Sequence, residues 1–463
     1  MKRIVKIAGR TLLALSGAVL TAWGVLLIVN YSDQPPSAAS IRLARPNAAQ
    51  PQVREQDNGY VFMLGFGTGL AQDPQTLGAQ RVAWSHQMKG KEASDIGSAY
   101  PTPDSAPQDA ATAEMKALIA SCKTVDRACE AALEGGSATI DAALEADRWL
   151  YERYQALLAR AAFQETSAYD LRLPFPRFAP VLNGQRLLFL QAWTHAGKGD
   201  APAIRALLER DGRFWRMTLA SSNTLIVKMI ASAALIKNFE WGSLIMRRLP
   251  AHAVAAAVPG HWREAISTPE RSMLRALAGE YAYLEHATQS LDREALSGLY
   301  PRLGETDAAF VADAVLPPLF QRQDYLNRCA AMLSALGDTF EVPYHAFPAA
   351  LERARTLTQQ VRAQAFDRPL YNVPGNLMVA ASDFDITSYP GRLSDMEGLR
   401  RAALLTAELR SAAVEPAQVK LRLVDAALRN PYDGAPFWWD GTTSSIVFVG
   451  VEATSRGRHA LPY

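Results

Sequence analysis

The chain of 463 residues is 49% hydrophobic and 20% charged. This composition supports a large buried core and excludes the disordered and collagen-like classes of protein. The formal net charge of +2 is nearly neutral, so the composition gives no electrostatic reason to expect nucleic-acid binding, and we expect no nucleic-acid partner.

The N-terminus carries a short basic tail followed by a long apolar segment. Residues 1–10 contain four basic residues and no acidic residue, and residues 11–31 contain no charge. A helix needs about 20 residues to cross a bilayer core, and only a helix satisfies its own backbone amides there. We predict a transmembrane helix over residues 11–31, with the basic tail retained in the cytoplasm.

A cleaved signal peptide is the competing interpretation of this segment. The apolar core of a signal peptide is usually about 7–15 residues long, with a small-residue cleavage site close behind it. Here the first plausible site, Ser37–Ala39, lies well past the end of the apolar run. We therefore favour an uncleaved signal-anchor in the bacterial inner membrane, with the bulk of the chain in the periplasm.

The next residues predict a spacer and then the start of the folded body. Residues 32–56 are rich in Pro and Ala and have no sustained apolar period, so we expect an extended spacer that lifts the body off the membrane. The apolar run at 57–66 predicts a buried helix, although the pattern also allows a strand. Asp73-Pro74 is an N-cap followed by Pro at the first helical position, which predicts a helix to about Met88.

The cysteines indicate a corner in the chain. Cys122 and Cys129 are seven residues apart, and Cys329 stands alone. In one unbroken helix the first two Cα atoms would lie roughly 10 Å apart, beyond the limit of about 7 Å for a disulfide. A bridge therefore requires a corner, which Asp126 would provide by capping a new short helix. We predict a disulfide between Cys122 and Cys129; two buried free thiols are the alternative.

The body divides by pattern into three regions. Residues 57–180 form an N-terminal helical region, residues 181–366 a central helical array, and residues 367–463 a C-terminal α+β region. In the first region, an apolar face over about 140–161 predicts one helix. Three prolines within residues 171–180 predict an extended connection to the central array.

The central region is helical in pattern throughout. Its most apolar stretch is interrupted by Arg216, Lys228 and Lys237, so we interpret it as a core helix and not as a second membrane span. Amphipathic helices with short links pack as a bundle or array. The helices predicted here cover residues 185–196, 201–210, 214–238, 269–287, 305–316 and 321–336.

Two further helices are predicted near the C-terminus. The first, near 394–410, presents Arg400 and Arg401 outward together with Glu408. Residues 376–381 before it fit either a helix or a strand. The second helix covers 416–428 and groups three apolar residues on one face, namely Leu421, Val424 and Leu428.

The last element is a predicted β-hairpin. Residues 437–440 and 445–449 have strand patterns, and residues 441–444 form the turn between them. The expected fold class is therefore mainly α, with an N-terminal transmembrane helix, a helical bundle or array, and a small C-terminal β-hairpin.

The tail from Pro431 to Trp439 reads P-Y-D-G-x-P-F-x-W. It resembles a closing element of uncharacterised single-pass bacterial envelope proteins, and so do the patterns at 58–74 and 214–231. A P-x-x-G-x-P tail also closes some pseudopilin-like proteins, but this chain lacks their long N-terminal helix that merges into a pilin head. The resemblance implies a bacterial envelope protein and no activity.

The sequence holds none of the common catalytic motifs. Gly65, Gly67 and Gly69 lack the spacing of a dinucleotide or phosphate loop, and neither a G-x-S-x-G elbow nor an S-x-x-K pair is present. The seven histidines are scattered, without the spacing of a zinc site. We assign no catalytic, cofactor-binding or metal residue and expect no cofactor.

Three weaker candidates remain. Asp383 and Asp385 form a D-x-D, which metal-dependent sugar transferases use to share a cation, although a turn explains the pair as well. Residues 261–264 (His-Trp-Arg-Glu) place a base, an aromatic and an acid together, as in a sugar site or in a partly buried helix start. The aromatic cluster at 437–439 would stack on sugar rings, or bury Phe437 and Trp439 in the core.

These features predict a membrane-anchored, non-catalytic envelope scaffold or interaction protein with a helical periplasmic body. Its partners would be the inner membrane and other envelope proteins. The alternative is an envelope enzyme that acts on polysaccharide or peptidoglycan. An enzyme of this kind should have a deep cleft with two carboxylates roughly 5–10 Å apart, and a scaffold should have a shallow groove or an exposed apolar patch.

Overall fold

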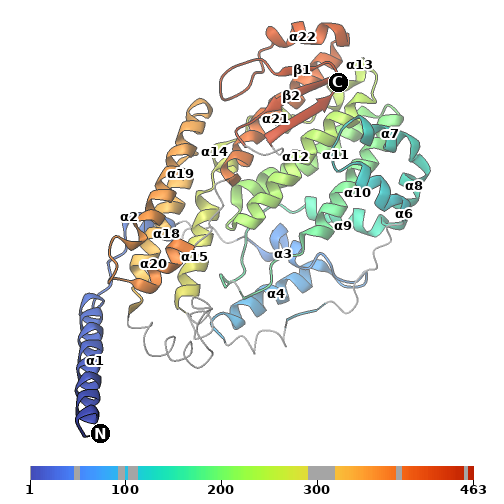
Figure 1. The fold of residues 1–463 in the computed structure, drawn as a ribbon. Helices are drawn as coiled ribbons and strands as arrows, with labels where there is room; N and C mark the ends of the chain where they lie inside the picture. The colour runs from blue at the N-terminus through green and yellow to red at the C-terminus, as the bar shows by residue number, and fades with distance from the viewer. Residues whose placement is uncertain are drawn as a thin grey trace.

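The fold class predicted from the sequence is confirmed. The described chain is mainly helical, with one apolar N-terminal helix and a small antiparallel sheet near the C-terminus. Figure 1 shows the N-terminal helix projecting from one end of the body and the sheet at the far end. The computed structural model describes residues 2–45, 53–91, 100–102, 113–170, 172–289, 319–381, 388–452 and 457–463.

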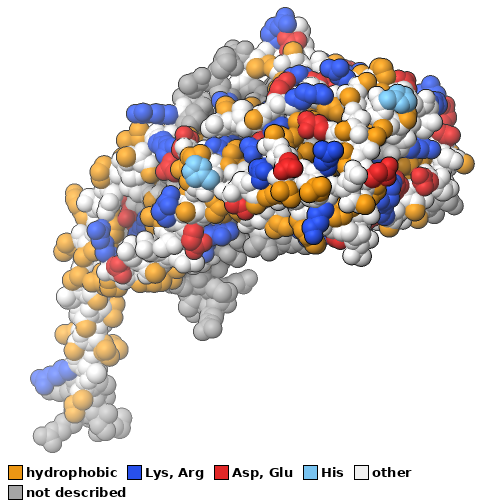
Figure 2. All heavy atoms as spheres, turned by 90° about the horizontal axis from the view of Figure 1, so that it is seen from above, with side chains coloured by type: hydrophobic (Ala, Val, Ile, Leu, Met, Phe, Trp, Pro, Cys, Tyr) orange, Lys and Arg blue, Asp and Glu red, His pale blue; other side chains and the backbone are white. Residues whose placement is uncertain are grey.

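The apolar N-terminal segment forms α1 (Lys2–Val29). Its part from Gly9 to Val29 is long and apolar enough to cross a membrane, and none of its most apolar window is buried against the body. Figure 2 shows this helix as a largely apolar rod that extends away from the rest of the molecule. A core helix of a soluble protein would be buried, so this exposure favours a membrane span.

The extended spacer predicted over 32–56 is wrong in part. Within it, α2 (Ala38–Ala44) begins at Ser37, which accepts the backbone N–H of Ser40, and Leu43 is fully buried. Pro35 and Pro36 precede Ser37, so the Ala-rich stretch directly after them is free to form a helix that docks on the body. It packs against α15 (Leu274–Gln289) and α18 (Arg322–Asp338).

The N-terminal region folds into short helices. The buried helix predicted at 57–66 and the helix predicted from Asp73 to Met88 are confirmed. The single helix predicted over 140–161 is wrong, because the chain breaks at Asp147. The part before the break (Ser137–Ala146) packs on the helix Ala113–Ser121, and the part after it (Arg148–Leu158) packs on the helix Gly59–Leu64. The described helices are α3 (Gly59–Leu64), α4 (Pro74–Met88), α6 (Ala113–Ser121), α7 (Arg127–Gly135), α8 (Ser137–Ala146) and α9 (Arg148–Leu158).

The central region is a helical array whose breaks differ from the prediction. One helix covers residues 201–221, across the gap predicted at 211–213, and the helix predicted over 269–287 is divided at residues 272–273. The helix predicted over 214–238 is interrupted, because Glu165 accepts the backbone N–H groups of Asn223 at 2.6 Å and Thr224 at 3.0 Å. A distant side chain thus replaces the helical partners of these amides. The helices before α15 are α10 (Phe178–Gly197), α11 (Ala201–Ser221), α12 (Leu225–Arg247), α13 (Ala251–Ala257) and α14 (Thr268–Arg271).

A further difference concerns the start of this array. The helix α10 begins at Phe178, inside the segment predicted to be extended, because Pro180 falls in the first helical turn, where no N–H is required. The helix predicted at 305–316 lies outside the described residues. After α18 the chain continues with α19 (Phe347–Ala363) and α20 (Val373–Ala381), so residues 376–381 are helical.

The long helix α21 (Tyr389–Ser411) confirms the helix predicted near 394–410, and Glu408 is exposed as predicted, but Arg400 and Arg401 do not face outward. Arg400 is only 4% exposed and Arg401 is half-buried. Both guanidinium groups donate to the fully buried carboxylate of Glu397, at 2.7–2.8 Å. Because α12, α13 and the sheet surround α21, charged residues on it are buried and therefore paired.

The predicted apolar face of the next helix is wrong. The helix α22 (Pro416–Val424) ends before Leu428, and Leu421 and Val424 on it are exposed. Val419 and Leu423, one turn apart, are its buried residues. The i,i+4 pair that faces the sheet therefore differs from the group of three residues that the apolar pattern suggested.

The predicted hairpin is confirmed, and a third strand extends it. The strands β1 (Trp438–Asp440), β2 (Ser445–Val449) and β3 (Arg458–Pro462) form an antiparallel sheet in the order β1-β2-β3. Phe437 is buried and Trp439 is half-buried against the core, whereas Trp438 is 54% exposed, so the core interpretation holds fully for Phe437 and in part for Trp439. One hydrophobic core runs from Leu43 through the helices to Leu461.

Candidate functional site

An open cleft of about 1150 Å³ lies beside the sheet. One wall is the corner at 123–128, between α6 and α7. The opposite wall is the β1–β2 turn with β3, and side chains of α12 form the floor. Arg392 and Asp395, near the start of α21, complete the lining. The cleft therefore joins segments that are hundreds of residues apart in the sequence.

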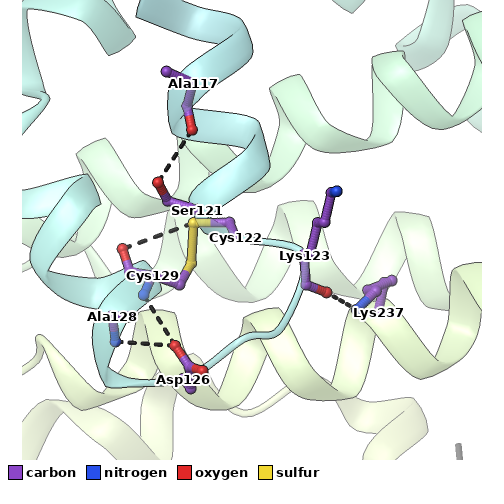
Figure 3. The surroundings of a disulfide bond; sticks show 8 residues. All are labelled: Ala117, Ser121, Cys122, Lys123, Asp126, Ala128, Cys129 and Lys237. Atoms are coloured by element: carbon purple, nitrogen blue, oxygen red, sulfur yellow. Dashed lines mark hydrogen bonds between the residues drawn. A yellow bond between two sulfur atoms is a disulfide. The ribbon is translucent and has the colours of Figure 1, made fainter.

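A disulfide shapes the corner that forms the first wall. Cys122 and Cys129 are joined, with their Cα atoms 4.5 Å apart, and the bond spans the turn between α6 and α7 (Figure 3). Asp126 caps α7 by accepting the backbone N–H groups of Ala128 at 2.9 Å and Cys129 at 3.1 Å. The corner predicted from the cysteine spacing is therefore present, and it is built from the cap that the sequence suggested.

Ion pairs fasten this corner to the rest of the cleft. Glu130 on α7 forms ion pairs with Arg127 and with Arg247 of α12. Arg127 and Arg247 each donate to the backbone carbonyl oxygen of Tyr463, at 3.0 Å. Lys237 of α12 donates to the carbonyl of Lys123 at 3.5 Å (Figure 3). The corner, α12 and the end of β3 therefore form one connected frame.

The carboxylate on the cleft floor is already paired. Glu240 on α12 contacts His459 of β3 at 3.1 Å and accepts from Lys237 at 2.8 Å. Burial alone would raise the pKa of Glu240, but the hydrogen bond with His459 and the charge of Lys237 outweigh it and lower the pKa below its ordinary value. A carboxyl group with a lowered pKa is ionised at neutral pH and is unsuited to act as a general acid.

Two other carboxylates of the cleft lining hold the backbone in place. Asp440 accepts from the N–H groups of Thr442 and Thr443 in the turn, at 3.0 and 3.4 Å, and these hydrogen bonds lower its pKa despite partial burial. Asp395 is 2% exposed; burial raises its pKa, and it accepts from the Tyr432 hydroxyl and two backbone N–H groups. Their oxygens therefore have structural partners.

A smaller and more apolar pocket adjoins the cleft. It has a volume of about 510 Å³, and Lys123 and Lys237 line both spaces. Leu182, Phe189 and Trp241 contribute to its apolar wall. Its lining includes Lys and Arg side chains and no Asp or Glu among the described residues. The combined site offers a polar cleft of mixed charge beside an apolar pocket with a basic rim.

The histidine that the sequence singled out lies in the core. His261 is fully buried, and its two ring nitrogens contact Glu209 and Asn238, each at 3.2 Å. Asn238 in turn donates to the buried carboxylate of Asp211 at 2.8 Å. Glu264, the acid of the same tetrapeptide, is exposed. The structure thus separates the candidate acid and base, and the buried network around His261 has a structural role.

Of the remaining sequence features, the structure describes the glycine loop but not the D-x-D pair. The loop with Gly65, Gly67 and Gly69 directs carbonyl oxygens of residues 66, 68 and 69 at the Arg153 guanidinium, which is the reverse of a phosphate-binding loop. Asp383 and Asp385 lie outside the described residues. Within the described part of the chain, no group of three or more His, Cys, Asp or Glu residues is placed to hold a metal ion.

No family model, curated protein or solved structure matches this chain. Sequence reasoning found the corner, through Asp126 and the two cysteines, but it missed Glu240 and His459. Those two residues are 219 positions apart, and neither stands in a local motif that could have revealed them.

Proposed function

We propose that this chain is a single-pass, membrane-anchored envelope protein that binds a segment of another envelope protein in its cleft without catalysing a reaction. The anchor is α1, and the four basic residues of its first ten place the N-terminus in the cytoplasm. The helical body then lies on the other side of the membrane, where the disulfide between Cys122 and Cys129 is stable.

The composition of the cleft supports a polypeptide as the bound partner. Its walls carry Lys, Arg, Asp and Glu together with the hydroxyl groups of residues 442–445, so it offers donors and acceptors of both charges. The visible surface in Figure 2 likewise mixes basic and acidic side chains without a large patch of one sign. A polyanionic partner would require a basic surface instead. The adjoining pocket has room for an apolar side chain of the bound segment.

The proposal that the cleft is non-catalytic depends on the pKa values and the hydrogen-bond partners of its carboxylates. Glu240 and Asp440 have lowered pKa values and fixed partners. Burial raises the pKa of Asp395, but this carboxyl group is 2% exposed and accepts from three donors, so it does not reach a substrate in the cleft. A glycosidase needs one carboxyl group with a raised pKa that can reach its substrate, beside a second, free carboxylate. The carboxylates that line this cleft do not supply such a pair.

Site-specific photo-crosslinking in native membranes tests the proposal. A benzophenone amino acid replaces Thr442 or Ala460, both exposed at the cleft, or Leu357 on the distant helix α19 as the matched control. We expect both cleft positions to give an adduct with the same protein, and Leu357 to give none. The charge reversal Arg458→Glu in the cleft should reduce the adduct several-fold.

Two results would contradict this proposal. One is an adduct of equal yield at Leu357, which would mean contact without a specific site. The other is release of soluble products from peptidoglycan or polysaccharide by the purified full-length chain, with the activity lost in Glu240→Gln. That second result would establish the enzyme alternative.

A further inference from the structure

The end of the membrane helix is fixed to the body by one buried side chain. Asn30 directly follows α1 and is 4% exposed. Its amide donates to the carbonyl oxygen of Leu370 at 2.8 Å, and its side-chain oxygen accepts from the N–H of Asn372 at 2.7 Å. Its backbone carbonyl accepts from the side chain of Gln321 at 2.7 Å. The end of α1 is thus bonded to the segment that precedes α20 and to the start of α18.

The residues after Asn30 extend this fastening. Asp33 accepts the N–H groups of Gln323 at 2.6 Å and Asp324 at 3.0 Å, and so caps the N-terminus of α18. Asn327 on the same helix donates to the carbonyl of Pro35 at 2.9 Å. Figure 1 shows α2, α18 and α20 gathered where α1 meets the body. The chain therefore passes from α1 into the body without a free hinge.

Exposed apolar side chains lie at this junction. Tyr31, the first residue after Asn30, is 91% exposed, and Phe366 and Leu370 are about half exposed. All five residues of 366–370 are exposed, including Arg368. Aromatic, apolar and Arg side chains together are typical of segments that lie in the headgroup layer of a bilayer. Single exposed apolar residues are common on any protein surface, so the position of this group matters more than its composition.

The bond between Asn30 and Leu370 sets that position. The uncharged segment from Thr11 to Asn30 is 20 residues long. As a helix it spans about 30 Å and matches the hydrocarbon core of a bilayer. Asn30 then lies at the edge of the hydrocarbon. The headgroup layer beyond it is roughly 5–8 Å thick. The Leu370 carbonyl lies within hydrogen-bond distance of Asn30. Leu370 therefore falls inside the headgroup layer.

We propose that residues 366–370 form a second membrane contact, which lies in the headgroup layer of the bilayer that α1 crosses. The inference rests on the proposed membrane anchor. Phe366 and Leu370 enter the interface, Arg368 reaches the lipid phosphates, and Asn30 holds this surface at a fixed height. The body is then held in one orientation, which fixes the direction in which the cleft opens.

Depth measurements on spin-labelled, full-length protein test this contact. The chain, in a Cys329→Ala background, is reconstituted into nanodiscs of phosphatidylcholine and phosphatidylglycerol. A nitroxide is attached to Phe366→Cys or Leu370→Cys, to Leu20→Cys inside α1, and to Leu421→Cys on the remote helix α22 as the aqueous control. The ratio of collision rates with oxygen and with a water-soluble nickel chelate reports the depth of each label.

We expect the ratio to be highest at Leu20 and several-fold higher at Phe366 and Leu370 than at Leu421. A high ratio at Leu20 with equal ratios at Leu370, Phe366 and Leu421 would overturn the second contact and leave the anchor intact. A low ratio at Leu20 would show that α1 is not in lipid, so the anchor and the contact would both be wrong.

Discussion

The substitution Glu397→Ala should lower the free energy of unfolding by about 3–5 kcal/mol, because it leaves a buried charge without its partner. The Glu397 carboxylate is fully buried and accepts from Arg400, from Arg401 and from the backbone N–H of Ile266. Arg400 is itself 4% exposed. Removal of the Glu397 carboxylate leaves the Arg400 guanidinium in the core without its partner, where water cannot replace the lost hydrogen bonds.

Denaturant unfolding of the full-length chain in mild detergent, followed by Trp fluorescence, measures this loss. The matched control is Glu145→Ala, which removes another Glu–Arg pair at a spacing of three residues, with Arg148. That pair is exposed, so its loss should change stability little or not at all. Similar losses in the two variants would mean that the burial of Glu397 does not determine its contribution.

Lys228 should make the protein more stable as the pH rises above neutrality. The residue is 2% exposed, and its ammonium nitrogen donates to the carbonyl oxygens of Leu219 at 2.6 Å and Pro269 at 3.2 Å. Burial lowers its pKa to about 7, against an opposing effect from Glu270. An unfolded Lys has a pKa of about 10.4, so between these values the unfolded chain binds more protons, and alkali favours the folded state.

Comparison with Lys228→Met isolates this effect, because Met fills a similar volume without a charge. The stability of the unsubstituted chain relative to the variant should increase by about 2 kcal/mol between about pH 7.5 and about pH 9.5. Unfolding curves of both proteins across this range measure the difference. A difference that stays constant with pH would show that Lys228 titrates alike in the folded and unfolded chains.

Local signals predicted the elements that local chemistry determines. Asp73 and Asp126 begin α4 and α7 where their capping side chains indicate, and the turn at 441–444 joins β1 to β2. Each of these features depends on residues within one turn of the chain, which the sequence places side by side.

The predictions that failed depend on distant partners. Glu165 breaks the apolar stretch after Ser221 by binding two amides from another part of the chain. Glu397 makes Arg400 a buried residue, although the helical pattern placed it outside. The strand β3 forms because β2 offers it an edge. None of these partners is visible in a window of neighbouring residues.

The candidate site was the least predictable part, for the same reason. Its corner could be derived from the spacing of Cys122 and Cys129, because disulfide geometry excludes a straight helix between them. The cleft itself requires α12, the start of α21 and the strands to meet. Glu240 and His459 acquire their roles only through that meeting, so their chemistry follows from the tertiary structure.

The placement of the body outside the cytoplasm is tested most directly by the accessibility of one introduced thiol. Leu421→Cys, on the exposed face of α22, is treated with a membrane-impermeant maleimide in intact spheroplasts, in the Cys329→Ala background. We predict that the Leu421→Cys thiol is labelled to the same extent before and after lysis. Labelling that occurs only after lysis would place the body in the cytoplasm and contradict the proposed anchor topology.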